Sequence, residues 1–296
     1  MSDFLTWAGA IQQRMEHVLD GMLPAADIAP HRLHEAMRYA AMGGGKRVRA
    51  LLTHAAGEFC GGDITGTETA AASIELIHAY SLVHDDMPCM DDDDLRRGKP
   101  SCHKRYDDAT ALLVGDALQS LAFQALSRPG LFADVNCQLK MVNLLALASG
   151  SRGMAGGQAI DLESVGKNLN QAELEFMHIQ KTGALIRAAA LLGANCAPDS
   201  ESQKIKAVDA YAQFIGLAFQ VVDDILDTEA DTTTLGKTAG KDADADKPTY
   251  VTILGLARAK ELAHELHNNA LNALKGFEHE AQRLIQLAQY ITQRSF

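Results

Sequence analysis

Long stretches of this chain repeat apolar residues with the spacing of an α-helix. In residues 67–86, Leu76, Tyr80 and Val83 are spaced at i, i+4 and i+7. Two further segments show the same pattern: 108–127 and 203–227. Alternating strand patterns are absent, and only seven of the 296 residues are proline. Several of these stretches are apolar on more than one face, which is typical of helices inside a large bundle, so the sequence predicts an all-α fold.

Glycine-rich or polar segments interrupt the helical pattern and predict where helices end. They are 42–47, 60–63, 127–130, 154–158, 195–200 and 232–248. None of them resembles an interdomain linker. Two aspartate-rich motifs each close a long apolar helix. We therefore expect one domain over residues 1–296, a single large helical bundle with both acidic helix ends facing a central cavity.

Charge and cysteine content exclude several classes of protein. The formal net charge is -11, which argues against nucleic-acid binding. No two of the five cysteines have CxxC spacing, so neither a disulfide framework nor a zinc cage is expected. The first residues lack the pattern of a signal peptide, and no apolar run reaches the ~18–20 residues of a membrane span. These features predict a cytoplasmic protein without a membrane span.

The second acidic motif, "QVVDDILD", contains Asp223, Asp224 and Asp227. Asp223 and Asp227 share a helix face, and Gln220 lies on that face too. Like charges at this spacing destabilise a helix by a few tenths of a kcal/mol unless a cation lies between them. Ligands that are all oxygens favour a hard ion, above all Mg²⁺. An ordinary solvated acidic face explains this motif equally well when it is taken alone.

The first acidic motif, "HDDMPCMDDDDLRRG", has a more unusual spacing. Asp85 and Asp91 would lie on nearly opposite faces of a straight helix. Pro88 between them cannot continue a helix, so we expect the helix to end near Met87 and the chain to bring Asp91 back toward Asp85. The motif lacks the ligand order of an EF-hand loop, and His84 has no second histidine or cysteine at zinc-ligand spacing.

Basic residues accompany both acidic motifs. Lys46 and Arg49 follow three glycines in "GGGKRVR", which is not a Walker A loop. Others follow in the chain: Arg96, Arg97, Lys181, Lys237, Lys241 and Lys247. Each alone is more typical of a solvated surface. Together, carboxylates that hold metal ions and basic side chains indicate a substrate with a diphosphate or triphosphate group.

Five motifs, in order and spacing, resemble the bacterial short-chain trans-prenyl diphosphate synthases, and among them most closely the farnesyl diphosphate synthases. They are "GGGKRVR", "HAYSLVHDDMPCMDDDDLRRG", "QKTGALI", "FQVVDDILD" and "LGKTAGKD". The resemblance covers essentially the whole chain. It implies a homodimeric enzyme of the isoprenoid synthase fold that joins an allylic diphosphate to isopentenyl diphosphate head to tail.

The resemblance also implies the roles of individual residues. Three Mg²⁺ ions, with Mn²⁺ as an alternative, would be held or supported by Asp85, Asp86, Asp91, Asp223, Asp224 and Asp227. The allylic diphosphate would be bound by Arg96, Lys181, Lys237 and Lys247. Isopentenyl diphosphate would be bound by Lys46, Arg49, His78 and Arg97. The carbocation formed during catalysis would face Thr182, Gln220 and the Lys181 carbonyl. Gln158 and Asp161 would support the metal ions from further away.

Two residues on the helix that carries Asp85 bear on product length. Tyr80 and Ser81 lie five and four positions before Asp85. In the family an aromatic residue at the position of Tyr80 accompanies a fifteen-carbon product, and the small Ser81 leaves room for a ten-carbon substrate. The resemblance therefore implies farnesyl diphosphate as product. Geranyl or geranylgeranyl diphosphate synthesis remains the alternative within the family, and a catalytically silent metal-binding bundle remains the alternative outside it.

Overall fold

The computed structural model describes residues 2–197, 201–229 and 248–293, and the regular secondary structure in these residues is helical apart from one short strand pair. The helices are α1 (Ser2–Met22), α2 (His31–Ala41), α3 (Val48–Cys60), α4 (Ile64–Asp85), α5 (Cys102–Arg105), α6 (Asp108–Leu126), α7 (Val135–Ser149), α8 (Met154–Ser164), α9 (Gln171–His178), the π-turn η1 (Ile179–Gly183), α10 (Ala184–Ala194), α11 (Ser202–Glu229), α14 (Tyr250–Leu254), α15 (Leu256–Ala273) and α16 (Gln282–Thr292). Strands β1 (Leu95–Arg96) and β2 (Lys99–Pro100) pair antiparallel. The predicted all-α class is confirmed.

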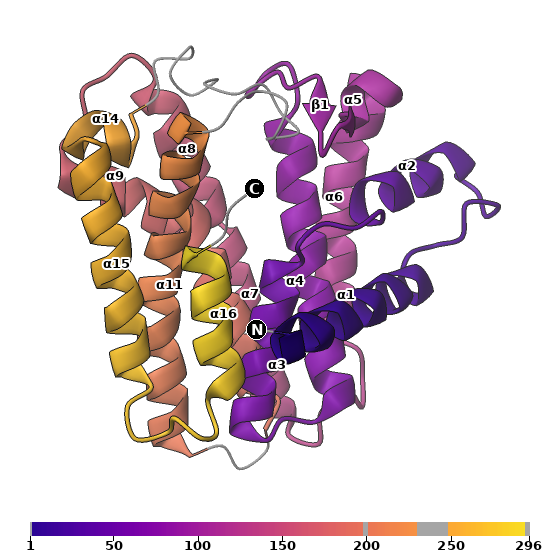
Figure 1. The fold of residues 1–296 in the computed structure, drawn as a ribbon. Helices are drawn as coiled ribbons and strands as arrows, with labels where there is room; N and C mark the ends of the chain where they lie inside the picture. The colour runs from indigo at the N-terminus through magenta and orange to yellow at the C-terminus, as the bar shows by residue number, and fades with distance from the viewer. Residues whose placement is uncertain (1, 198–200, 230–247, 294–296) are drawn as a thin grey trace.

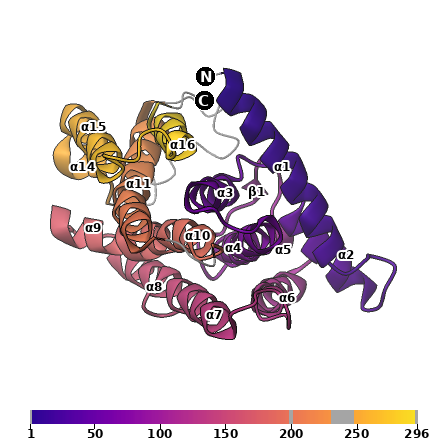
Figure 2. The same cartoon turned by 90° about the horizontal axis from the view of Figure 1, so that it is seen from below.

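The helices form a bundle with an inner group and an outer layer. Figure 2 shows α3, α4 and α10 near the middle, with the other long helices around them. Figure 1 shows α4 and α6 on one side and α11 and α15 on the other, with roughly parallel axes. Residues of α10 are buried on nearly every side, and a Cβ atom on Gly193 would lie 2.0 Å from the Thr53 carbonyl oxygen of α3. This close packing explains why the inner helices are apolar on more than one face.

Several helix boundaries lie where the sequence predicts them. Residues 42–47 and 127–130 are loops, and in the predicted break at 60–63 the helix α3 ends at Cys60 and residues 61–63 are a loop. Asp63 caps α4 by accepting a hydrogen bond from the Gly66 N–H at 2.8 Å.

The break expected at 154–158 is wrong, because α8 begins at Met154 and contains this segment. Its glycines permit close packing instead. A Cβ atom on Gly157 would lie 2.0 Å from the Lys181 backbone nitrogen, so η1 packs directly on the backbone of α8.

Two helices, α6 and α11, are long and apolar enough to cross a membrane by length and composition alone. The buried share of the apolar window is 33% for α6 and 50% for α11. This is weak evidence for a membrane span, because core helices of soluble proteins pass the same test.

Candidate active site

A cavity of about 640 Å³ lies between α4, the first acidic motif, α8, η1 and α11. The sequence-predicted residues that line it are Arg49, His78, Tyr80, Ser81, Asp85, Arg96, Arg97, Gln158, Lys181, Thr182, Gln220 and Asp223. Apolar side chains such as Leu82, Leu162 and Phe219 line it as well. The cavity therefore combines charged groups with apolar walls, as an amphiphilic anion requires.

The chain reverses at Pro88, as the sequence predicts. Helix α4 ends at Asp85, and the Asp91 N–H donates to the Asp85 carbonyl oxygen at 2.9 Å. Burial raises the pKa of Asp85 to about 6; Lys181 opposes this shift, and the nearby Asp91 adds to it. Carboxylates that converge in this way favour a divalent cation between them.

Asp86 is turned toward Arg96 and not toward the cavity. Asp86 is only 2% exposed, and both of its oxygens accept hydrogen bonds from Arg96 Nε, at 3.0 and 3.2 Å. Arg96 Nη2 also pairs with Asp93 Oδ2 at 3.4 Å. Asp86 therefore orients a cavity-lining guanidinium group. Asp91 is not among the residues that line the cavity.

In the second acidic motif, Asp223 lines the cavity, while Asp224 points into the protein. Asp224 Oδ1 accepts from Gln220 Nε2 at 2.8 Å, and its Oδ2 accepts from the Tyr250 N–H at 2.8 Å. Gln220 Oε1 in turn accepts from the Thr182 hydroxyl at 3.2 Å. Asp224 thus orients the two oxygen-bearing side chains at the cavity wall. Asp227 is not among the lining residues.

Lys181 and Thr182 lie on the π-turn η1, which interrupts an otherwise continuous helical segment from α9 to α10. A π-turn contains one residue more per turn than an α-helix and is frequent at functional sites. Lys181 Nζ donates to Asp161 Oδ2 at 2.6 Å, and Asp161 is only 5% exposed. The ammonium group is therefore held at the cavity from α8.

Arg49 and Arg97 form a second basic group in the cavity, which His78 also lines. Burial and four nearby guanidinium groups, Arg49 foremost, hold the pKa of His78 well below its usual range. Arg97 Nη1 donates to the Gly44 carbonyl oxygen at 2.7 Å, and its guanidinium lies where a Cβ atom on Gly45 would be. Gly45 has a φ of +114°, so glycine suits this position for two reasons.

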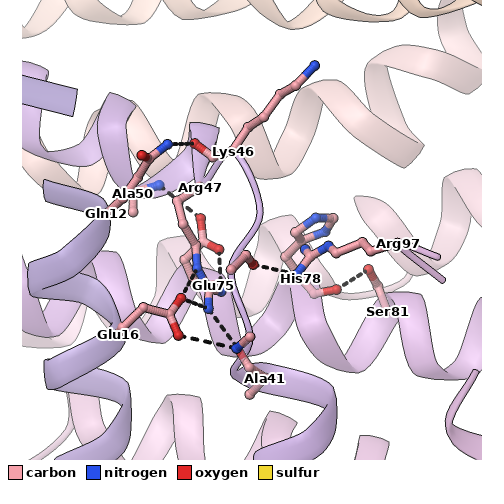
Figure 3. A network of polar contacts seen from close by, with 12 residues as sticks. Gln12, Glu16, Ala41, Lys46, Arg47, Ala50, Glu75, His78, Ser81 and Arg97 are labelled. Atoms are coloured by element: carbon pink, nitrogen blue, oxygen red, sulfur yellow. Dashed lines mark hydrogen bonds and ion pairs between the residues drawn. The ribbon is translucent and has the colours of Figure 1, made fainter. Parts of the chain in front are cut away.

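Two groups of predicted residues are not placed in the cavity. Lys46 is exposed and does not line it, and Figure 3 shows its side chain pointing away from Arg47. Lys237 and Lys247 lie outside the described residues. The predicted roles of these residues stay predictions.

An ion cluster behind the glycine loop is not among the sequence-predicted features (Figure 3). It joins the buried side chains of Arg47 and Glu75 with the partly exposed Glu16. Glu75 is the one acidic residue in the apolar run from Ala70 to Ala79 of α4. An ionised side chain in such a run needs a buried partner, so this position is a sequence signal for the cluster. Nothing in the sequence identifies Arg47 as that partner.

Comparison with known proteins agrees with this geometry. The profile of the polyprenyl synthetase family matches residues 30–288. The farnesyl diphosphate synthase of Escherichia coli is 48% identical over 266 residues, which cover 88% of this chain and 89% of that protein.

Two solved structures superpose over nearly the whole chain. An FPP/GFPP synthase from Zymomonas mobilis has a TM-score of 0.88 and 40% identity, covering 98% of this chain and 99% of the other. A geranyltransferase from Helicobacter pylori, complexed with magnesium and isoprenyl diphosphate, has a TM-score of 0.85 and 31% identity, covering 99% and 97%. With its acidic motifs and basic groups around one cavity, the chain belongs to the polyprenyl synthetase family.

Proposed function

We propose that this protein is a prenyltransferase that joins dimethylallyl diphosphate to isopentenyl diphosphate, and then joins the resulting geranyl diphosphate to a second isopentenyl diphosphate, to form farnesyl diphosphate. Each condensation releases one diphosphate. The observation that supports this proposal is that Asp85 and Asp223 line the same cavity as two separate groups of basic side chains. One basic group contains Arg96 and Lys181, and the other contains Arg49 and Arg97. Two diphosphates can therefore bind side by side.

The carboxylates fit divalent cations. Burial and Asp91 make the ionisation of Asp85 unfavourable in the absence of metal, and both amide atoms of Gln158 are buried without a hydrogen-bond partner among the described residues. Asp85, Asp91 and Asp223 would hold Mg²⁺, and Mn²⁺ is an alternative of the same hard class. Three ions per site are part of the proposal. When bound, they would neutralise the charge that develops on the leaving diphosphate.

The protein side chains perform the rest of the reaction. Arg96 and Lys181 bind the allylic diphosphate and stabilise its charge as the allylic C–O bond breaks. The oxygens of Thr182 and Gln220 face the resulting carbocation, and the Gln220–Asp224 bond keeps them oriented. Arg49, His78 and Arg97 hold isopentenyl diphosphate, whose double bond attacks the cation. The departed diphosphate accepts the proton that is lost, so no protein base is required.

Purified protein with Mg²⁺, isopentenyl diphosphate and dimethylallyl diphosphate tests the proposal. We expect diphosphate release that EDTA abolishes, and a fifteen-carbon product in chromatography. Folded protein that releases no diphosphate would favour a silent metal-binding bundle. A ten- or twenty-carbon product would keep the reaction and reassign the product to geranyl or geranylgeranyl diphosphate.

We also propose that residues 1–296 form one catalytic domain that works as a homodimer. The larger of two hydrophobic clusters extends from Phe4 in α1 to Ile291 in α16, and α11 contributes residues to both clusters, which supports a single domain. Exposed leucines on α6 and α7 support a helical interface: Leu112, Leu113, Leu139 and Leu147. Light scattering after size-exclusion chromatography measures the mass of the assembly.

The proposed location is the cytoplasm, without a membrane span. All five cysteines are free in the structure, which fits a reducing compartment. Fractionation of cells that express the tagged protein tests this location.

A further inference from the structure

We infer that Arg47 and Glu75 are positioning residues for the isopentenyl diphosphate subsite. Their buried ion pair fixes the backbone of residues 42–47, which presents Lys46 and leads into Arg49. This inference rests on the proposed function, because it concerns how the same cavity is held ready for one of its two substrates.

The side chain of Arg47 is a rigid connector. It is 2% exposed, and it reaches three acceptors on three elements (Figure 3). Nη1 pairs with Glu75 Oε2 on α4 at 3.1 Å, and Nη2 pairs with Glu16 Oε1 on α1 at 2.6 Å. Nη2 also donates to the Ala41 carbonyl oxygen at the end of α2, at 2.8 Å. A planar guanidinium can make these contacts at once, whereas the single ammonium of lysine cannot.

The two carboxylates hold the main chain on either side of Arg47. Glu75 Oε1 accepts from the Ala50 N–H at 3.0 Å, which is one of the unpaired donors in the first turn of α3. Glu16 Oε2 accepts from the Gly43 N–H at 3.2 Å. The entry to the loop and its exit into α3 are thus both attached to the same ion cluster.

The backbone of Arg47 needs this support. Its φ of 47° and ψ of 39° lie in the left-handed region, which residues with a side chain rarely adopt. Such a conformation persists where the surrounding contacts impose it. Without the ion pair the backbone would relax, and the neighbouring Lys46 and Arg49 would move with it. Arg49 lines the cavity, so the displacement would reach the substrate.

The charge of Glu75 alone predicts the opposite effect on binding. Glu75 acts electrostatically on Arg49 and Arg97, and a negative charge near these groups opposes a diphosphate. If Glu75 were only a counter-ion, its replacement by glutamine would strengthen isopentenyl diphosphate binding. A positioning role predicts weaker binding, so the sign of the change separates the two roles.

Calorimetric titration with isopentenyl diphosphate alone measures this binding, because no reaction occurs without the allylic substrate. For Glu75→Gln and Arg47→Lys we expect the dissociation constant and KM of isopentenyl diphosphate to rise about ten- to a hundredfold. The KM of dimethylallyl diphosphate should stay within about twofold. Glu68→Gln is the matched control, since Glu68 on α4 also pairs with α1, through Arg14 at 3.2 Å, and does not touch the loop.

Tighter binding in Glu75→Gln, or an equal rise of both KM values in folded protein, would overturn the inference. Glu75→Gln guards against a variant that fails to fold, because Arg47 keeps Glu16 as a charged partner at 2.6 Å; unchanged isopentenyl diphosphate binding there would also overturn the inference. The titration separates this inference from the proposed function. If the wild-type protein binds isopentenyl diphosphate but makes no product, the proposed function is disproved and the inference about Arg47 and Glu75 is not.

Discussion

Lys181 Nζ donates to Asp161 Oδ2 at 2.6 Å, and this bond connects the π-turn to α8 at the wall of the cavity. Asp161 is buried, whereas Lys181 is partly open to the cavity. The lysine therefore meets its substrate from a fixed position. Most of its rotational freedom is already lost before the substrate binds.

Asp161→Asn should lower kcat by about ten- to a hundredfold. The ammonium group of Lys181 would lose its charged partner and would no longer be held next to the leaving diphosphate. Steady-state kinetics with both substrates at saturation measures this change. Asp134→Asn is the control, since asparagine also caps α7 and the residue lies outside the cavity. An Asp161→Asn enzyme with wild-type kcat would show that Lys181 does not depend on this contact.

Gly157→Ala should nearly abolish activity and lower the free energy of unfolding, because the new Cβ atom would lie 2.0 Å from the Lys181 nitrogen. We expect a loss of about 1–3 kcal/mol, as for other overpacked sites. Urea unfolding and product formation measure the two effects. Gly9→Ala in α1 is the control, because nothing lies within 4 Å of its Cβ position and alanine should stabilise the helix there. Equal effects of both substitutions would argue against a special role for the α8–η1 contact.

Tyr80→Ala should lengthen the product beyond fifteen carbons, because Tyr80 lines the cavity and its removal deepens it. The ring of Tyr80 packs edge-on against His84, with centroids 5.4 Å apart, so its position is well supported. Chromatography of the products measures chain length. An unchanged distribution would exclude Tyr80 as the floor of the cavity.

Ser81→Phe should shorten the product toward ten carbons, because a phenyl ring at this lining position fills the space that a geranyl chain needs. The same chromatographic assay applies, with geranyl diphosphate tested as a substrate. Continued fifteen-carbon synthesis would contradict the placement of the growing chain along α4.

In metal-free protein, the contribution of Asp85 to the free energy of unfolding should depend on pH. Its folded-state pKa of about 6 is raised from 3.8, so its contribution to stability is full at low pH and is lost as the pH rises through about 6. Metal-free Asp85→Asn should therefore exceed the wild type in stability at pH 7, by on the order of 1–3 kcal/mol, and match it near pH 4. Unfolding in EDTA measures this difference. A variant less stable than wild type in EDTA at pH 7 would refute the burial effect.

Adding Mg²⁺ is the companion measurement. Saturating Mg²⁺ should stabilise the wild type more than Asp85→Asn, because only the wild type retains this carboxylate ligand. Equal stabilisation of both proteins would mean that the ions bind without Asp85.

Local patterns in the sequence predicted much of the fold and part of the site. Apolar periodicity identified the inner helices, and Pro88 predicted the reversal that ties Asp91 to Asp85. Both are local effects of backbone geometry. The glycines of residues 154–158 led to a wrong prediction, since a glycine can end a helix or permit close contact with a neighbouring backbone.

The orientation of neighbouring aspartates could not be read from the sequence. Asp85 and Asp86 are adjacent, yet one lines the cavity and the other is buried against Arg96. Likewise, Asp223 lines the cavity, whereas Asp224 is buried and accepts a hydrogen bond from the Tyr250 N–H. Which of two identical residues faces the substrate depends on partners that are distant in the sequence, such as the Tyr250 backbone.

The π-turn also bears on how the chain tolerates insertions and deletions. An α-helix advances by about 100° per residue, so deleting one residue within 179–183 would restore a regular helix without disturbing α9 or α10 as helices. Because the wide turn completes the same rotation with one residue more, α9 and α10 would keep their present faces, and only the side chains within 179–183 would change direction. The bundle could survive such a deletion as a folded protein with its cavity chemistry lost. The extra residue of this one turn therefore serves the placement of Lys181 and Thr182 at the cavity, and the helices on either side do not need it to stay folded.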